Sequence, residues 1–398
     1  MLAFHYYNPV QVYFENGAVS KLGEYLRGKY RCYLLVCAKG PFRENGLYQT
    51  VYQQLVNAGG KVVEVGDIDS NPKLHSVREG VELARKHQAD CVVALGGGSA
   101  MDCSKLIALS ASTGVDPYEY VWGSRPAAGS SLDTVMIPTI AATGTELNNT
   151  AVIVNEETRE KYWCVCAFPK YCIMDPAITA TLPEKLTVWG GMDILSHTFE
   201  YYFNGCMDSE FQLDLSEALI TAVMRALETL SKRPDDLTAR GELLWCSCVT
   251  WGTGLTKIGR RDPDMACHSI EESFSGYFDT HHGACLGVLT PRWMRMVSPQ
   301  HPEIFARFAR RVMQVQEPDD KCAAEAGINA YIRWLKQLGA PQCYQDLSPK
   351  LQFSPEELNL VAKNAWRIYK GKIGRLQPLS FQEVQNLLEE GRKPISLS

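Results

Sequence analysis

The stretch "VVALGGGSAMDCSK", residues 92–105, passes from an apolar β-rich run through three glycines and a serine into a helical pattern. Glycines allow backbone N–H groups to approach a ligand closely, and a helix N-terminus adds unpaired donors and a positive dipole end. The pattern favours a pyrophosphate-binding turn at Gly97, Gly98 and Ser99, with a plain tight turn as the alternative. Asp102 follows on the first helical turn, pointing towards the same end of the sheet. The spacing matches neither a P-loop nor the G-x-G-x-x-G fingerprint.

The first half of the chain repeats this alternation of strand and helix. Four apolar β-rich runs are strand candidates: residues 32–38, 61–68, 91–97 and 134–140. Two helical patterns lie between them: residues 46–59 and 73–87. Nearly continuous apolar strands that alternate with helices predict a parallel sheet with helices on both faces.

After about residue 182 the strand patterns stop and only helical spacing remains. Pro183 followed by an acid, and Ser354 followed by a proline, are typical helix starts. We therefore expect a Rossmann-like α/β dinucleotide-binding domain at residues 1–182 and an all-helical domain at residues 183–398. Ligands are expected to favour the cleft between two such domains.

The composition narrows the classes of function. The chain has 398 residues, 45% of them hydrophobic, and a net charge of −5 with acids and bases interspersed. No basic stripe predicts nucleic-acid binding, and no apolar run is long enough to span a membrane. The opening segment lacks the pattern of a signal peptide, and most of the 14 cysteines lie in apolar runs without CxxC spacing. These features predict a soluble cytoplasmic protein without disulfides.

Two further segments carry candidate chemistry. "PTIAATGTE", residues 138–146, again follows a strand, and two such loops on adjacent strands would flank a nucleotide. Alone, this segment is equally consistent with an ordinary hydroxyl-rich loop.

In the helical half, Asp193 and His197 are spaced i and i+4, so they share a helix face. Alone, that pair is more often a salt bridge, but with His268 and His282 it forms a site suited to Fe²⁺ or Zn²⁺.

The chain resembles the iron-containing (group III) alcohol dehydrogenase family, and within it the bacterial butanol-dehydrogenase-type branch. The segments that carry the resemblance are "GGGSAMDCSK", "PTIAATGTE", "DPAITATLP", "GMDILSHTFE" and the stretch from His268 to "HHG". They occur in the family's order along nearly the whole length. The resemblance implies the dehydroquinate synthase-like fold of this family, with a metal-binding helical domain, and a homodimer.

The resemblance also implies a site. Asp193, His197, His268 and His282 would bind the metal, while His281 matches no ligand and is expected to be an exposed neighbour. The metal would be Fe²⁺, with Zn²⁺ as the alternative. The cofactor would be a nicotinamide dinucleotide, contacted by Ala38, Lys39, Asn71, Gly97, Gly98, Ser99, Asp102, Thr139, Thr143 and Lys161.

The implied activity is hydride transfer between NAD(P)(H) and a primary alcohol or its aldehyde. One departure from the family lies at Glu272, where many members have a histidine implicated in proton handling. Glu272 either takes over proton transfer as a catalytic residue, approaches the metal as an extra ligand, or lowers activity. Two other functions stay open: a member that binds cofactor and metal without turnover, and a lyase of the dehydroquinate-synthase type.

A second departure concerns the choice of cofactor. No acid follows the first predicted strand, where one would bond the ribose 2′-hydroxyl of NAD. Lys39 and Arg43 lie there instead and would pair with a 2′-phosphate. The sequence therefore slightly favours NADP(H) over NAD(H), unless both cations simply face solvent.

Overall fold

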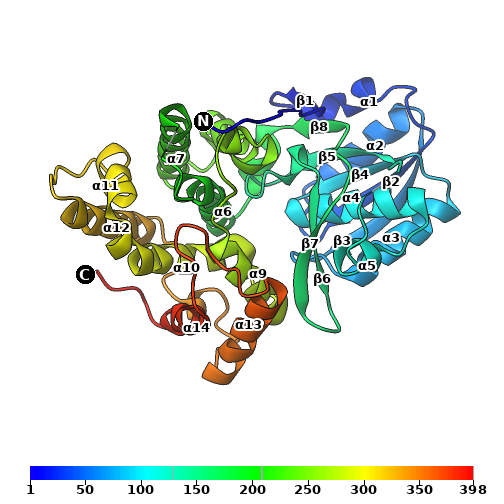
Figure 1. Cartoon of the computed structure of the whole chain (residues 1–398). Coiled ribbons are helices and arrows are strands. Elements are labelled where there is room, and N and C mark those ends of the chain that lie inside the picture. The colour runs from blue at the N-terminus through cyan, green and yellow to red at the C-terminus, as the bar shows by residue number, and fades with distance from the viewer. Residues whose placement is uncertain (128, 208, 398) are drawn as a thin grey trace. The chain divides into compact units, whose positions relative to one another are not determined.

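The computed structural model describes residues 1–127, 129–207 and 209–397, which divide into two compact units (Figure 1). The sheet unit comprises Tyr6–Leu182 and Pro234–Thr253. The helical unit comprises Met1–His5, Pro183–Arg233 and Gly254–Ser398. A division at residue 182 thus coincides with one junction of the units, but residues 234–253 group with the sheet. The two domains that we propose are therefore discontinuous along the chain.

A six-stranded parallel sheet forms the centre of the sheet unit, in the order β1-β8-β5-β4-β2-β3. Its strands are β1 (Gln11–Phe14), β2 (Cys32–Ala38), β3 (Lys61–Ile68), β4 (Cys91–Gly96), β5 (Asp133–Pro138) and β8 (Tyr171–Met174). The four strands expected from the sequence are β2 to β5, and the α/β fold class is confirmed. A separate antiparallel hairpin pairs β6 (Thr150–Asn155) with β7 (Glu160–Val165).

Helices cover both faces of this sheet (Figure 1). They are α1 (Leu22–Tyr25), α2 (Leu47–Asn57), α3 (Leu74–Lys86), α4 (Gly98–Thr113) and α5 (Pro117–Val121). Helix α8 (Leu237–Ser247) also belongs to the sheet unit. Successive residues of a strand point to opposite faces. Leu34 and Val36 of β2 accordingly pack with α3, α4 and α5, whereas Tyr33 and Leu35 pack with α1 and α2. Apolar burial on both faces explains the nearly continuous apolar strands.

The helical unit contains no strand among its described residues. Its helices are α6 (Glu184–Tyr202), α7 (Glu210–Leu230), α9 (Ala266–Phe278), α10 (His282–Val297), α11 (Pro302–Arg311), α12 (Asp320–Gln337), α13 (Pro355–Ile368) and α14 (Phe381–Glu390). The predicted start at Ser354 is confirmed, because its hydroxyl caps Glu357 N–H and the Glu357 carboxylate caps Ser354 N–H. None of the helices in the described part of the chain is long and apolar enough to cross a bilayer.

Helix α6 is buried on nearly all sides over its last three turns and packs against α7 and α10. A helix that is buried on all sides belongs to a core. Polar side chains on such a helix must find partners within the protein or in a bound ion, because water does not reach them.

Candidate metal and nucleotide sites

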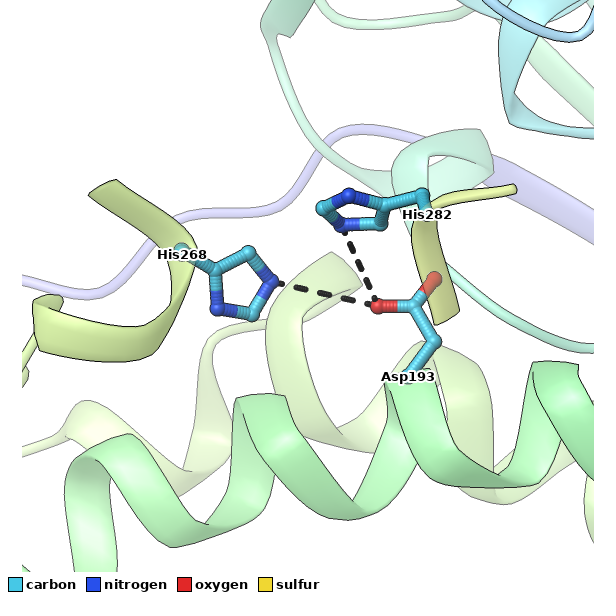
Figure 2. A group of neighbouring side chains, drawn as sticks. All are labelled: Asp193, His268 and His282. Atoms are coloured by element: carbon cyan, nitrogen blue, oxygen red, sulfur yellow. Dashed lines mark ion pairs between the residues drawn. The ribbon is translucent and has the colours of Figure 1, made fainter. Parts of the chain in front are cut away.

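Three of the four expected metal ligands converge on one point of the helical unit. Figure 2 shows the rings of His268 and His282, from α9 and α10, turned towards the Asp193 carboxylate of α6. The Asp193 Oδ1 atom lies 3.6 Å from Nε2 of His282 and 3.9 Å from Nε2 of His268. One ligand atom from each residue lies within 4.8 Å of the others. Metal bonds of about 2.0–2.2 Å would fit between such donors.

His197 lies beside this group, one helical turn after Asp193. Its Nδ1 atom is 3.2 Å from Asp193 Oδ1, and its ring centroid is 4.4 Å from that of His268. It does not belong to the group of three whose ligand atoms converge. Its place as a fourth ligand therefore stays a prediction.

Two glutamates that the sequence reasoning missed support the histidines from behind. Glu200 Oε1 lies 2.5 Å from Nδ1 of His268, and Glu271 Oε2 contacts Nδ1 of His282. Both acids are buried. A carboxylate on one ring nitrogen fixes the orientation and tautomer of the imidazole and leaves the other nitrogen for a metal. The only signal in the sequence was an acid three residues after a histidine, inside each of two buried helices.

The charges of the cluster are set by burial and by the contacts between Asp193 and the histidines. Burial would raise the pKa of Asp193, but the neighbouring His197, His282 and His268 hold it well below its usual range. Burial lowers the pKa of His197 to about 3, although Asp193 opposes this. Burial also opposes protonation of His268, but Glu200 and Asp193 outweigh it and raise the pKa of His268 to about 10. In the metal-free cluster an ionised carboxylate therefore stands among imidazoles, of which His197 is neutral and His268 keeps its proton until a metal ion displaces it.

The side chains of the cluster fit a divalent ion. Asp193 Oδ1 and His268 Nε2 are both buried without a hydrogen-bond partner in the part of the chain that the structure describes. Leaving such a group unsatisfied costs about 1–3 kcal/mol. One carboxylate oxygen and imidazole nitrogens are ligands that both Fe²⁺ and Zn²⁺ accept. The residues present fit either ion.

Removing the carboxylates behind the histidines should weaken metal binding. We expect Glu200→Gln and Glu271→Gln each to lower metal affinity by about ten- to a hundredfold, because the imidazole loses its orienting acceptor. Competition with a chelator, read on the purified protein, measures the change. The exposed Glu303 of α11 provides a matched control, Glu303→Gln, with no expected effect. Unchanged metal affinity in both test variants would contradict the orienting role.

Glu272 is buried on α9, one helical turn after His268. It is not part of the converging group, so an extra oxygen ligand at this position gains no support. Its Oε2 atom instead accepts a hydrogen bond from the phenol of Tyr369. His281, expected to be exposed, is partly buried, with its ring centroid 4.9 Å from that of Trp189.

The two glycine- and hydroxyl-rich loops lie against each other in the sheet unit. The N–H of Thr139 donates to the carbonyl of Gly96 over 3.0 Å. A Cβ on Gly98 would lie 2.8 Å from Thr143 Cγ2, so a side chain there would push the second loop away. Gly97 precedes α4, Gly98 and Ser99 begin it, and all three are partly exposed. A helix N-terminus of this kind is suited to binding an anion.

Two other expected cofactor residues lie in the segment after β3 and in β7. Lys161 Nζ donates to Asn71 Oδ1 over 3.2 Å, and both residues are buried. The hydroxyl of Ser99 donates to the carbonyl of Ser70, which joins this segment to the glycine loop. The structure thus brings the loops after β4 and β5 together at the carboxyl end of the sheet, as the sequence predicted, and the segment after β3 joins them there.

Both carboxylate oxygens of Asp102 form hydrogen bonds within the protein. Its two oxygens accept from the Thr145 hydroxyl over 2.6 Å and from Val152 N–H over 2.9 Å. These bonds hold the second loop and the β6–β7 hairpin to α4. A contact between Asp102 and a cofactor stays a prediction, since both oxygens already have protein donors.

The two cations that follow β2 both face acids. Lys39 follows Ala38 at the end of β2, and its Nζ lies 3.7 Å from Oδ1 of Asp69. The guanidinium of Arg43 pairs with Glu64. The sequence shows no acid directly after this strand, but the loop after the neighbouring strand β3 supplies one in space.

Comparison with known proteins gives a consistent result over nearly the whole chain. The sequence model described as "Iron-containing alcohol dehydrogenase" matches residues 9–176, and "Fe-containing alcohol dehydrogenase family, C-terminal" matches residues 187–391. A probable NADH-dependent butanol dehydrogenase from Bacillus subtilis is 33% identical, over 98% of this chain and 99% of the relative. The NADPH-dependent aldehyde reductase YqhD from Escherichia coli is 26% identical, over 86% and 88%.

A solved structure agrees with these matches. The crystal structure of an NADH-dependent butanol dehydrogenase A from Thermotoga maritima superposes with a TM-score of 0.92 and 34% identity, covering 99% of both chains. The fold is therefore that of a known dehydrogenase over its full length. The chain belongs to the iron-containing alcohol dehydrogenase family and is a metal-dependent NAD(P)(H) oxidoreductase of alcohols and aldehydes.

Proposed function

We propose that this protein interconverts a primary alcohol and its aldehyde at a divalent ion held by Asp193, His197, His268 and His282. The observation that carries this proposal is the convergence of Asp193 Oδ1 with two imidazole nitrogens, each backed by a buried carboxylate. When bound, the ion polarises the substrate oxygen and the nicotinamide supplies or accepts the hydride.

The chain's own residues supply the remaining functions. Glu200 and Glu271 orient the histidines, and the first turn of α4 offers N–H groups to the cofactor's pyrophosphate. Glu272 is our candidate for accepting the alcohol proton, because it is buried one helical turn from His268. The relatives are named as dehydrogenases and reductases. This supports an active dehydrogenase over a protein that binds cofactor and metal without turnover, and over a lyase.

The test is reconstitution of activity. Metal-stripped protein is loaded anaerobically with Fe²⁺ or Zn²⁺, and aldehyde-dependent oxidation of NADH and NADPH is followed. Turnover that returns with one ion supports the proposal and identifies the metal; the family's description favours iron. Full turnover without any metal would refute it.

Two further proposals rest on the resemblance and the composition: a homodimer and a cytoplasmic location.

The cofactor preference that we now propose differs from the slight preference for NADP(H) in the sequence. Lys39 and Arg43 both face acids, so neither offers an uncompensated charge to a 2′-phosphate. The relative from Bacillus subtilis is named as NADH-dependent, whereas YqhD is named as NADPH-dependent. We propose that NAD(H) serves at least as well as NADP(H), with Asp69 setting the balance.

Neutralising that acid should shift the preference towards NADPH. We expect Asp69→Asn to raise the ratio of kcat/KM for NADPH over NADH by about tenfold, because Lys39 is released and one negative charge is removed. Steady-state kinetics with both cofactors at one ionic strength measure the ratio. Glu82→Gln, at an exposed position of α3, is the control. A ratio that stays the same or falls would show that Asp69 does not select the cofactor.

A further inference from the structure

Helix α10 contacts the backbone of α6 at Gly283, the residue after the expected metal ligand His282. A Cβ on Gly283 would lie 2.1 Å from the carbonyl oxygen of Trp189 and 3.1 Å from Cβ of Asp193. A backbone oxygen cannot yield to a side chain at 2.1 Å, so one of the two helices would have to move. Gly283 is buried, and its lack of a side chain allows the start of α10 to lie directly against α6.

The next glycine of α10 makes a softer contact. Gly287 lies one helical turn later, on the same face of the helix. A Cβ on Gly287 would lie 3.2 Å from Cγ of Met192. The methionine side chain is flexible and can yield by a few tenths of an ångström, whereas the Trp189 carbonyl is part of the helix backbone. Of these two glycines, Gly283 is therefore the one that fixes the separation of the helices.

This contact is linked to two of the expected metal ligands. Trp189 lies one helical turn before Asp193 on α6, and Gly283 directly follows His282 on α10. Nε2 of His282 lies 3.6 Å from Oδ1 of Asp193 (Figure 2). On the other side of His282, the ring centroid of His281 lies 4.9 Å from that of Trp189. Trp189 thus contacts both sequence neighbours of this ligand.

We propose that Gly283 is a positioning residue that sets the distance between the His282 imidazole and the Asp193 carboxylate before a metal ion binds. This inference rests on the proposed function. The backbone contact with Trp189 fixes where α10 begins relative to α6, and Glu271 orients the ring of His282. Position and orientation of this ligand thus come from two separate contacts. Ligands that are already in place lose less conformational freedom when the ion binds.

A methyl group at position 283 should displace His282 and weaken metal binding. In Gly283→Ala, the new Cβ has to retreat from 2.1 Å to about 3.4 Å from the Trp189 oxygen, where such contacts become ordinary. His282 moves with α10, so we expect the Kd for Fe²⁺ and for Zn²⁺ to rise at least about tenfold. Competition with a chelator on metal-stripped protein measures the Kd. Gly287→Ala, the matched control, should leave it unchanged.

A second substitution separates positioning from a general loss of packing. Asp193→Glu lengthens the carboxylate side chain by one methylene group, and alone it should weaken metal binding because the site is set for aspartate. Combined with Gly283→Ala, it should bring the Kd back towards that of the unmodified protein, since the longer side chain reaches across the wider gap. Defects that multiply in the double variant, or an unchanged Kd in Gly283→Ala, would overturn the proposal.

Hydrogen exchange on the unmodified protein tests the proposal without any substitution, and so decides it even if Gly283→Ala does not fold. The N–H of Cys285, in the first turn of α10, donates to the carbonyl of His281 over 3.2 Å. If the start of α10 is fixed in advance, this amide should exchange as slowly as those of the later turns in the metal-free protein. Fast exchange there that slows to the rate of the later turns only after Zn²⁺ is added would contradict the proposal.

Failure of this inference is distinguishable from failure of the proposed function. If the unmodified protein turns over an aldehyde and Gly283→Ala binds the ion equally well, only the role of Gly283 is refuted. If the unmodified protein binds the ion but reduces no aldehyde, the proposed function fails, whereas the Kd values still report on the positioning of His282. If it binds neither Fe²⁺ nor Zn²⁺, both fail together.

Discussion

Replacing Asp193 with alanine should abolish metal retention and lower kcat/KM for aldehyde reduction by at least about a thousandfold. Asp193 Oδ1 is the atom on which the cluster centres, 3.2 Å from His197, 3.6 Å from His282 and 3.9 Å from His268. It is also the only acid of the converging group. A metal that polarises oxygen contributes several kcal/mol to catalysis, and about 1.4 kcal/mol corresponds to a tenfold change in rate.

The measurement pairs metal analysis with kinetics. Purified Asp193→Ala is reconstituted anaerobically with Fe²⁺ and with Zn²⁺, its metal content is determined after desalting, and turnover is followed with NADH. Asp235→Ala, at an exposed aspartate, should retain both metal and activity. Circular dichroism confirms that the variant is folded. A stoichiometric metal content together with undiminished kcat/KM in Asp193→Ala would refute the proposed site.

The sheet illustrates what the sequence predicted and what it did not. Strands β2 to β5 were predictable because each is an apolar β-rich run between turn and helix signals. Strands β1 and β8 are four residues long, too short for a period to be read. The grouping of Pro234–Thr253 with the sheet unit was also hidden, because helical periodicity does not say which partner a helix packs against.

In the metal site, too, local patterns were predictable from the sequence and contacts between separate elements were not. The spacing of Asp193 and His197 and the resemblance to a family pointed to the ligands, because both depend on local patterns. Glu200 and Glu271 escaped notice, since each supports a histidine on another helix. The pairs Lys39–Asp69 and Tyr369–Glu272 likewise join separate elements. Contacts of this kind depend on tertiary packing, and no periodic pattern in a single sequence shows which helices or loops will meet.

Lys105 gives the largest expected change in stability. Its side chain is 1% exposed, and four acceptors of the second loop and the start of β6 lie 2.5–2.9 Å from Nζ, around its three N–H donors. These are the carbonyl and hydroxyl of Thr145, the side-chain oxygen of Asn148 and the carbonyl of Thr150. The Asp102 carboxylate lies 3.9 Å away. Burial lowers the pKa of Lys105, and Asp102 opposes that effect.

Substituting this lysine removes the charge while leaving its surroundings buried. We expect Lys105→Met to lower the free energy of unfolding of the sheet unit by about 3–5 kcal/mol, because Asp102 keeps a buried charge without its cation. Equilibrium urea unfolding measures the loss, and hydrogen exchange at the amides of α4 assigns it to the sheet unit. Lys86→Met, at an exposed position of α3, is the control.

A second variant identifies the cause of the loss. If the uncompensated charge dominates, Asp102→Asn combined with Lys105→Met should recover part of the stability, since the pair then carries no charge. The hydrogen bonds from Nζ to its four neighbouring acceptors would still be absent, so recovery should be incomplete. NADH affinity should remain impaired in both variants, because Lys105 anchors the loop that packs against the glycine turn. A loss below about 1 kcal/mol in Lys105→Met would mean that water or a rearranged loop replaces the ammonium at little cost.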